Sequence, residues 1–379
     1  MFLLRSIILR YQLPSIARAR RPFGIIVTIG SLAIALLGAC NRPPSDDRPA
    51  AVAADPAVRV FVSDETGGNV VIVDPESGQV IDRLPVGKRP RGVRLSRDGS
   101  QLLVALSGSP IAGPGVDEST LPPPDRSADG VGVIDLASRK LVRTINTGQD
   151  PEAFDISPDG RTLYVSNEDA AEMSVVDLAT GAIRKRVPVG GEPEGVTVRP
   201  DGRVVYVTCE ADNEVVAVDT ATLEIAGRVK AGPRPRAIVF TDDGATAFVS
   251  LETGAAIAVI DGTTHRLSGT IAIPSTAGTP TAPRPMGVEL SPDRRQLIVS
   301  LGRAMSVGVI DVASRTFVRS IENVGTRPWG IGVSPDGRKA YTANGPSGDV
   351  SVVDIAAGTI DRRIAVGGSP WGIAVAASR

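Results

Sequence analysis

The sequence predicts an all-β chain folded as a seven-bladed β-propeller, and three observations predict it. Short apolar runs alternate with turn residues, and no apolar stripe of helical period lasts for three turns. A four-strand plan recurs about every 42 residues. Aromatic residues make up only 3% of the chain, so the core must consist of Val, Ile, Leu and Ala, which suits stacked sheets.

The clearest copy of the repeat covers residues 149–189. In Ser157-Pro158-Asp159-Gly160, Pro fixes φ and Gly tolerates positive φ, so the chain is expected to reverse there. A second turn is expected at residues 177–181. The four predicted strands, here called a to d, are Ala153–Ser157, Thr162–Ser166, Met173–Asp177 and Ile183–Val189, with an open loop at 167–172.

An aspartate ends strand c in each copy of the repeat, so its positions give the number of copies. Seven positions carry it: Asp74, Asp135, Asp177, Asp219, Asp261, Asp311 and Asp354. Strand c is apolar on both faces in most copies, as expected for sheets packed between neighbouring blades. The repeats begin with a strand b at Val58–Ser63 and finish with a strand a at Gly372–Ala376. We therefore expect both ends of the chain to share one blade and close the ring.

The N-terminal residues predict export and lipid attachment. Residues 1–24 contain five Arg and no acid, and a 13-residue apolar run, Ile25–Leu37, precedes Leu-Gly-Ala-Cys40. We expect a lipoprotein signal peptide at 1–39, lipidation at Cys40, a flexible Pro- and Ala-rich tether at 40–57 and the propeller at 58–379. The alternatives are an ordinary signal with a chance Cys, or a twin-arginine signal. Asn41 favours the outer membrane, so a periplasm-facing lipoprotein is expected.

The charge of the chain limits the kinds of binding partner that are expected, and its cysteine content limits the possible disulfides. Lys and Arg total 41 against 42 Asp and Glu, and the basic leader leaves the rest of the chain mildly acidic, which argues against nucleic acid. With Cys40 lipidated, Cys209 has no disulfide partner and is expected to be a small buried packing residue. Contact with the membrane is expected through the lipid anchor only, and the protein is expected to be a monomer.

Two insertions distinguish one face of the ring. Gly108–Gly130 lies between strands b and c of the second blade, and Ile273–Pro283 lies between strands d and a of later blades. Both connections belong to the face opposite the regular turns, so this variable face is the candidate binding face. The alternative is that any exposed loop tolerates insertion.

A Pro-X step precedes each innermost strand, and X is expected to point to the mouth of the channel on the variable face. In ring order these residues are Trp371, Arg91, Glu152, Glu194, Arg236, Met286 and Trp329. Loop residues Glu168 and Glu210 join the acidic side, as do Asp150, Asp169 and Glu192. Glu65 and Glu252 repeat the position of Glu168 on other blades, and one interpretation is that they are rim charges only.

The mouth allows more than one interpretation. The tryptophans could stack a flat ligand or plug the channel. The carboxylates could hold Ca²⁺ or simply be solvated and paired with arginine. No metal site and no cofactor are assigned. The single histidine, His265, falls in a turn on the opposite face, so we assign no catalytic residue.

Tyr164-Val165-Ser166-Asn167 and Tyr206-Val207-Thr208-Cys209 resemble the YVTN-type β-propeller repeat. The arms Arg89-Pro90-Arg91-Gly92, Glu192-Pro193-Glu194-Gly195 and Pro370-Trp371-Gly372 are similar to those of the PQQ-dependent catabolism-associated β-propeller proteins. That resemblance implies an exported accessory to periplasmic quinoprotein alcohol catabolism, without assigned catalytic residues. The lipobox and the long insertion of the second blade depart from the pattern.

We therefore expect a lipid-anchored binding or scaffold protein that takes a protein partner or a small ligand at the variable face. One alternative is a metal-dependent, lactonase-like propeller hydrolase with Asp150, Glu152, Glu168, Glu194 and Glu210 as ligands. The other is a structural or adhesive YVTN protein of the cell surface.

Overall fold

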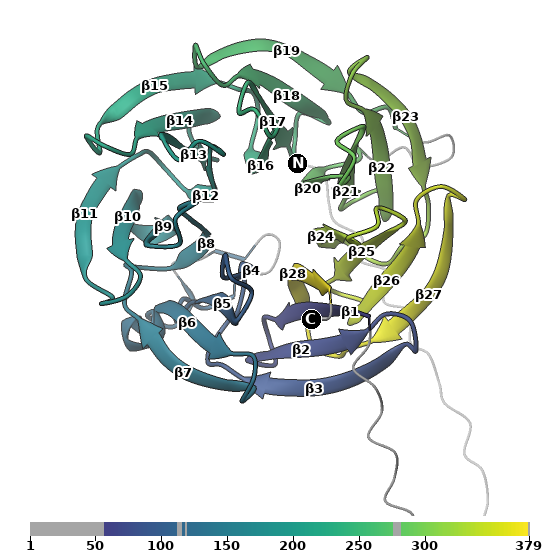
Figure 1. Ribbon diagram of the computed structural model, residues 1–379, viewed down its shortest axis with the longest axis horizontal. Helices are drawn as coiled ribbons and strands as arrows, with labels where there is room; N and C mark the ends of the chain where they lie inside the picture. Colours follow the sequence, from purple (N-terminus) through teal and green to yellow (C-terminus); the bar gives the residue numbers. More distant parts are fainter. Residues whose placement is uncertain (1–56, 112–115, 118–119, 276–281, 378–379) are drawn as a thin grey trace, which may run out of the picture. The chain divides into compact units, whose positions relative to one another are not determined.

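Seven four-stranded antiparallel sheets surround a central channel in the computed structural model (Figure 1). The structure describes residues 57–111, 116–117, 120–275 and 282–377. These residues belong to the unit Ala54–Arg379. The predicted all-β class and the seven blades are confirmed.

The strands occupy four positions in each blade, from the channel outward. The innermost strands are β28 (Pro370–Ala377), β4 (Val93–Leu95), β8 (Pro151–Ile156), β12 (Pro193–Val198), β16 (Pro235–Phe240), β20 (Pro285–Leu290) and β24 (Pro328–Val333). The second strands are β1 (Val58–Asp64), β5 (Gln101–Leu106), β9 (Thr162–Asn167), β13 (Val204–Cys209), β17 (Thr246–Leu251), β21 (Gln296–Leu301) and β25 (Lys339–Asn344). The third strands are β2 (Asn69–Asp74), β6 (Gly130–Asp135), β10 (Glu172–Asp177), β14 (Glu214–Asp219), β18 (Ala256–Asp261), β22 (Ser306–Asp311) and β26 (Asp349–Asp354). The outer strands are β3 (Gln79–Pro85), β7 (Lys140–Ile145), β11 (Ile183–Pro188), β15 (Ile225–Lys230), β19 (Arg266–Ala272), β23 (Thr316–Ile321) and β27 (Thr359–Ala365).

Local turn chemistry sets the repeat. Between β8 and β9, the N–H of Gly160 donates to the carbonyl of Ser157 (2.9 Å), and Gly160 has a φ of 73°. Between β10 and β11, Asp177 accepts the N–H of Thr180 (3.0 Å), and Gly181 has a φ of 75°. Both predicted turns are therefore present, because glycine occupies the left-handed position that each one requires.

The apolar core lies between the blades and not at the centre of the ring. Leu103 and Val131 of the second blade, for example, pack in one cluster with Phe154 and Leu163 of the third. Third strands such as β2 bury four consecutive residues, Val70–Val73, so both faces of the sheet are covered. Each blade thus depends on its two neighbours for its stability.

The two ends of the described chain meet in one blade. Strand β28 pairs antiparallel with β1, with Val60 opposite Val375 and Phe61 opposite Ala374. The sheet order β28-β1-β2-β3 confirms the predicted closure. The unpaired edge that either end would otherwise leave is thereby removed.

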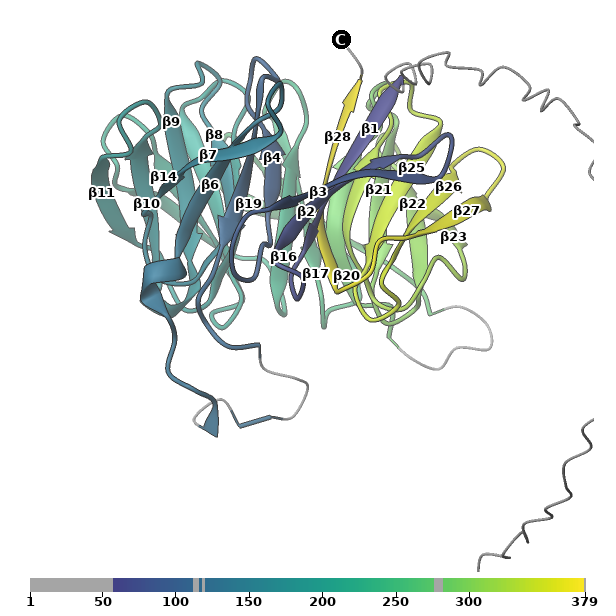
Figure 2. The same cartoon turned by 90° about the horizontal axis from the view of Figure 1, so that it is seen from below.

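The blade-joining connections and the loops after the second strands lie on one face, from which the second-blade insertion projects (Figure 2). This insertion contains a 3-10 helix, η2 (Arg126–Ala128). A second 3-10 turn, η3 (Glu168–Ala170), replaces the open loop expected at 167–172. Residues 112–115, 118–119 and 276–281 of the two insertions lie outside the described residues.

The predicted signal peptide, the lipidation site Cys40 and the tether up to residue 56 also lie outside the described residues, so they stay predictions. Among the residues that the structure does describe, no helix is long and apolar enough to cross a membrane.

Candidate functional site

Eight of the nine predicted binding residues line one cavity at the mouth of the channel. Its volume is about 610 Å³. These eight residues are Arg91, Glu152, Glu168, Glu194, Glu210, Arg236, Trp329 and Trp371. Met286 is different: it is buried, and it lines the channel below the mouth.

Hydroxyl groups on the second strands position the mouth residues. Ser166 Oγ donates to the carbonyl of Glu194 in the next blade (2.6 Å) and accepts the N–H of Ala153 in its own blade (3.1 Å). The same link joins Ser63 to Arg91, Thr208 to Arg236, Ser250 to Met286 and Ser300 to Trp329. This role was not predicted from the sequence, although the Ser or Thr recurs at the third position of the YVTN-like motif.

In each arm, the residue before the proline is the second residue that bears on the mouth. In six blades it is a non-glycine residue in the left-handed region, with φ between 39° and 54°. These residues are Arg89, Asp150, Glu192, Arg234, Arg284 and Arg327. A left-handed conformation costs a non-glycine residue about 1–2 kcal/mol, so the fold retains charged side chains here against a backbone penalty.

Arg91 is the centre of the first charge cluster. Its guanidinium group is almost fully buried and forms ion pairs with Asp150 and Glu152. Its Nη1 also lies 3.5 Å from a carboxylate oxygen of Glu168. Ser107 Oγ donates to the same Asp150 oxygen. One arginine thus compensates three carboxyl groups that come from the neighbouring blade.

Arg236 is the centre of the second cluster. Its guanidinium group pairs with Glu194 and lies 2.9 Å from both Glu210 and Glu252. Glu252 is only 2% exposed and also pairs with Arg284, at 2.8 Å. The interpretation of Glu252 as a rim charge is therefore wrong, because two arginines hold it inside the wall of the mouth. The acidic side thus contains two arginine-centred clusters, and the charge of Glu194 in the second still acts on Glu168 in the first.

Two carboxyl groups of these clusters bind their protons unusually tightly. Burial raises the pKa of Glu168 to about 8, and the nearby charges of Glu194 and Asp150 add to the effect. Burial likewise raises the pKa of Glu210 to about 8, with Glu194 and Glu252 contributing in the same direction. At neutral pH the mouth therefore contains protonated carboxyl groups beside ionised ones, that is, donors as well as acceptors.

The carboxylates do not fit a metal ion as they stand. Oxygens of Asp150, Glu152 and Glu168 lie within 4.8 Å of one another, as Ca²⁺ ligands would. The cationic group of Arg91 already pairs with all three. Glu194 and Glu210, which the metal hypothesis included, belong to the other cluster.

The two tryptophans form the opposite side of the mouth. The rings of Trp329 and Trp371 are stacked, with centroids 6.3 Å apart and an interplanar angle of 17°. The guanidinium carbon of Arg327 lies 4.4 Å from the Trp329 ring centroid. Since both indoles line the mouth cavity, they are not simply buried beneath the arms.

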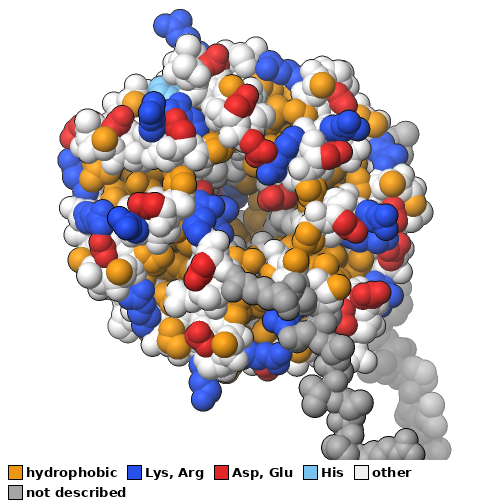
Figure 3. Space-filling view, in the orientation of Figure 1, with side chains coloured by type: hydrophobic (Ala, Val, Ile, Leu, Met, Phe, Trp, Pro, Cys, Tyr) orange, Lys and Arg blue, Asp and Glu red, His pale blue; other side chains and the backbone are white. Residues whose placement is uncertain are grey.

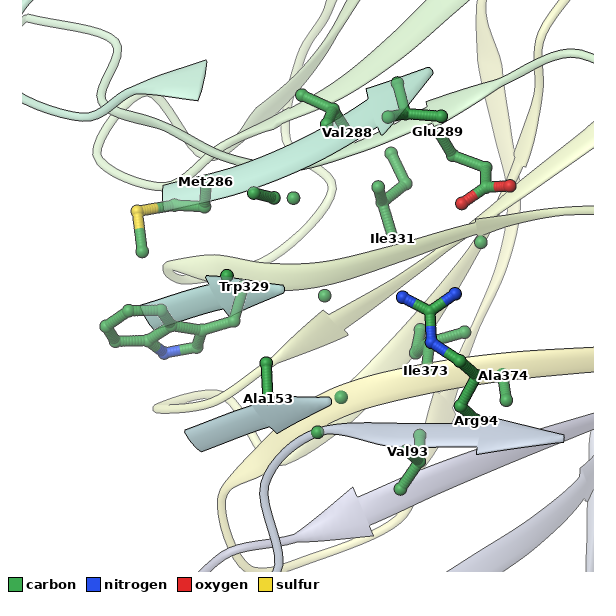
Figure 4. Close-up of a pocket in the computed structure, with 18 of the residues that line it drawn as sticks. Val93, Arg94, Ala153, Met286, Val288, Glu289, Trp329, Ile331, Ile373 and Ala374 are labelled. Carbon is green, nitrogen blue, oxygen red and sulfur yellow. The ribbon is translucent and has the colours of Figure 1, made fainter. Parts of the chain in front are cut away.

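The mouth leads into the channel, whose cavity is about 460 Å³. Glu194, Arg236, Trp329 and Trp371 line both spaces and so mark the boundary between them. Figure 4 shows Met286 and Trp329 at one end of the channel and Arg94 and Glu289 at the other, with aliphatic side chains between. Figure 3 shows the other end of the ring, the face of the regular turns, where charged side chains of both signs surround the opening of the channel.

The second-blade insertion forms part of the cavity wall. Ser109, Pro110 and Ile111 from its start and residues 121–124 from its middle line the mouth. Arg89 secures it by donating to the carbonyl of Ser109 (2.9 Å) while pairing with Glu65 (3.0 Å). The insertion thus adds to the wall of the mouth cavity on the variable face.

The single histidine and Cys209 lie away from the mouth. His265 lies in the turn between β18 and β19, and its Nδ1 contacts the hydroxyl of Tyr206 (2.8 Å). Cys209 is fully buried, and burial raises the pKa of its thiol to about 12. Neither residue lines the mouth cavity.

Solved structures share the fold at low sequence identity. The periplasmic gluconolactonase of Pseudomonas aeruginosa matches with a TM-score of 0.68 and 22% identity, over 85% of this chain and 99% of that one. Hydrazine synthase of Kuenenia stuttgartiensis matches with a TM-score of 0.62 and 19% identity, over 76% and 95%. A protein of unknown function from Desulfotomaculum acetoxidans gives 0.69 and 15%, over 85% and 99%. These likenesses establish the fold alone.

No curated protein matches the sequence significantly. Two family models match parts of it. One, described as a choice-of-anchor I domain, covers residues 45–233. The other, described as a YNCE-like β-propeller, covers residues 185–378, just over half of the 379-residue chain. Together with the seven observed blades, this match shows that the chain belongs to the YNCE-like β-propeller family.

Proposed function

We propose that this propeller is a binding protein whose mouth cavity takes a small polyhydroxylated ligand. The observation that carries the proposal is the convergence of charged hydrogen-bonding groups and indole rings in one cavity of about 610 Å³. A sugar-like ligand needs both: hydroxyl groups pair with carboxylates and guanidinium groups, and the C–H face of the ring packs on tryptophan.

The polar side of the cavity supplies both donors and acceptors for hydrogen bonds with such a ligand. Glu152 is 4% exposed, and one of its carboxylate oxygens has no hydrogen-bond partner among the described residues. An unpaired buried acceptor costs about 1–3 kcal/mol, and a ligand hydroxyl would recover this cost if the carboxylate turned toward the cavity. Protonated Glu168 and Glu210 would act as donors.

The proposal extends to the cellular setting. The lipobox ending at Cys40 supports attachment of a periplasm-facing protein through acyl chains, and Asn41 supports the outer membrane; we take the protein to be a monomer. The arms around Arg91, Glu194 and Trp371 support a role beside periplasmic quinoprotein alcohol catabolism, where oxidised polyols and sugar acids would be available as ligands. Removal of Cys40 should release the protein from membranes without changing ligand binding.

Hydrolysis of a sugar lactone at the same cavity is the second candidate. Carboxyl groups with a pKa of about 8 beside ionised carboxylates favour it, because such a pair can donate and accept protons near neutral pH. The shared fold of the P. aeruginosa gluconolactonase suggests the test substrate. The metal-dependent form of this hypothesis is disfavoured because the guanidinium group of Arg91 already supplies a positive charge between the carboxylates.

Intrinsic fluorescence tests the binding function directly, because the chain has only two tryptophans and both line the mouth. Titration with D-glucose, D-gluconate or D-glucono-1,5-lactone should change the emission saturably for at least one of them. In Glu152→Gln/Glu194→Gln the affinity should fall about 10-fold or more, since two charge-assisted hydrogen bonds are weakened. Glu224→Gln, on an exposed turn of the fourth blade, is the matched control.

The outcomes separate the two candidates. Saturable binding without lactone turnover supports the binding protein. Lactone turnover faster than the spontaneous rate supports the hydrolase if the double variant abolishes it. If a chelator also abolishes that turnover, the metal-dependent form of the hypothesis is supported. An emission that no probe changes would overturn the proposal.

A further inference from the structure

Arg327 differs in its contacts from the other arginines of the mouth. Five arginines line the cavity in the described part of the chain: Arg89, Arg91, Arg234, Arg236 and Arg327. The first four form ion pairs with carboxylates. Within those same described residues, Arg327 has no carboxylate within ion-pair distance and contacts the face of Trp329 instead.

The contact with Trp329 holds the guanidinium group in place without using its N–H donors. At 4.4 Å from the ring centroid, the interaction is a close cation–π contact. Arg327 also belongs to the left-handed positions before the arm prolines, with a φ of 54°, which orients its side chain to the cavity. The donors of a fixed guanidinium fork suit the planar geometry of a carboxylate or phosphate.

The surroundings of Arg327 carry excess positive charge. Burial lowers the pKa of Arg327, the charge of Glu252 raises it, and the charges of Arg236, Arg284 and Arg303 lower it further. Arg236 and Arg284 are themselves neutralised by glutamates, but Arg303 is exposed and has no ion pair among the described residues. An anion at Arg327 would therefore meet attractive charge on the tryptophan side of the mouth.

We propose that Arg327, beside the stacked Trp329 and Trp371, is an anion subsite, so that the ligand of the mouth is a polyol or sugar bearing a carboxylate or phosphate group. This inference rests on the proposed binding function and adds the substrate class to it. The hydroxyl groups of the ligand would face the glutamates of the two clusters, and its anionic group would pair with Arg327. A neutral sugar would leave that arginine unpaired.

Tryptophan fluorescence titrations with D-glucose, D-gluconate and D-glucose 6-phosphate test this class. At low ionic strength the wild type should bind at least one of the two anions about 10-fold more tightly than glucose. Arg327→Gln should remove that preference, because it should lower the affinity for the anion about 10-fold more than the affinity for glucose. Arg303→Gln, which changes an exposed neighbour outside the cavity lining, is the matched control and should keep the preference. The anion that binds better identifies the group as carboxylate or phosphate.

Quenching by iodide and caesium ions provides a readout that needs no sugar. A free cation beside the indoles should make iodide the stronger quencher in the wild type, and Arg327→Gln should lower iodide quenching about twofold or more relative to caesium. If iodide discriminates but no sugar binds, the anion subsite stands and the polyhydroxylated ligand is wrong. If glucose and both anions bind equally, the subsite is wrong and the binding function stands. Unchanged quenching and unchanged anion affinity in Arg327→Gln would overturn the inference.

Discussion

Replacing Ser166 with alanine should destabilise the ring at the joint between two blades. The Ser166 hydroxyl is fully buried, donates to the Glu194 carbonyl at 2.6 Å and accepts the Ala153 N–H at 3.1 Å. Its loss leaves the buried Glu194 carbonyl and the half-buried Ala153 N–H without this partner, at a cost of about 1–3 kcal/mol. Since Glu194 belongs to the mouth, the local loosening should also reach the site.

The magnitude can be converted into a melting temperature. An unfolding entropy of about 2.1 cal/mol/K per residue gives about 0.7 kcal/mol/K for a propeller of roughly 320 residues. The Ser166→Ala variant should therefore melt about 1.5–4 °C below the wild type in a circular dichroism scan. Urea unfolding should show the same loss as a lower midpoint with an unchanged slope.

The repeat supplies its own controls. Thr208 makes the same two contacts in the fourth blade, so Ser166→Thr should melt close to the wild type. Blade seven has Ala343 at the matching position, next to Asn344 of the pair Pro328–Asn344, so Ala343→Ser should be neutral or stabilising. If Ser166→Ala melts with the wild type, or if Ser166→Thr loses as much stability as Ser166→Ala, the hydroxyl link is not what joins the blades.

Three further predictions concern charge and thiol chemistry. Arg91→Met leaves Asp150, Glu152 and Glu168 facing one another without their cation. The variant should lose about 3–5 kcal/mol of stability at about pH 8 and less at about pH 5, and millimolar CaCl₂ should restore part of the loss. A melting temperature that changes with neither pH nor calcium would contradict this. The pKa of Glu168 and of Glu210 is raised to about 8 from the ordinary 4.5, so the folded state binds more protons than the unfolded chain, and the stability due to these groups is complete below about pH 4.5 and lost as the pH rises through about 8. Glu210→Gln should flatten this slope in melts recorded across that range, and an equally steep slope would count against the assignment. Cys209, whose pKa is raised to about 12, should resist thiol reagents in the native protein at about pH 8 and react only on unfolding; rapid native labelling would show that its strand opens.

The fold was predictable because its determinants are local. Gly160 and Gly181 fix the turns through their left-handed backbone, and the alternation of turns with short apolar runs needs no long-range information. The predicted closure followed from the order of strands alone. The innermost strand β4 is the exception among the blades: it has only three residues, although the repeat predicts a full strand.

The candidate site was less predictable, because its chemistry depends on which side chain reaches which neighbour. The Pro-X pattern identified the ring of mouth residues, but it could not show that Arg91 pairs with three acids of the next blade. Met286 is turned into the channel, and Glu252 is drawn inward by two arginines. Arg327 was missed because the position before the proline gains access to the cavity only through its left-handed backbone.

The strand that closes the ring also supplies part of the site. Trp371 lies at the start of β28, and Ser63 of its partner β1 accepts the N–H of Gly372 while it donates to the carbonyl of Arg91. A ligand that contacts both Trp371 and the second or third blade would span this seam, so binding energy would add to the energy of closure. Ligand occupancy and resistance to opening at the seam should then rise together, and hydrogen exchange of β1 and β28 would report on binding from the far end of the strand.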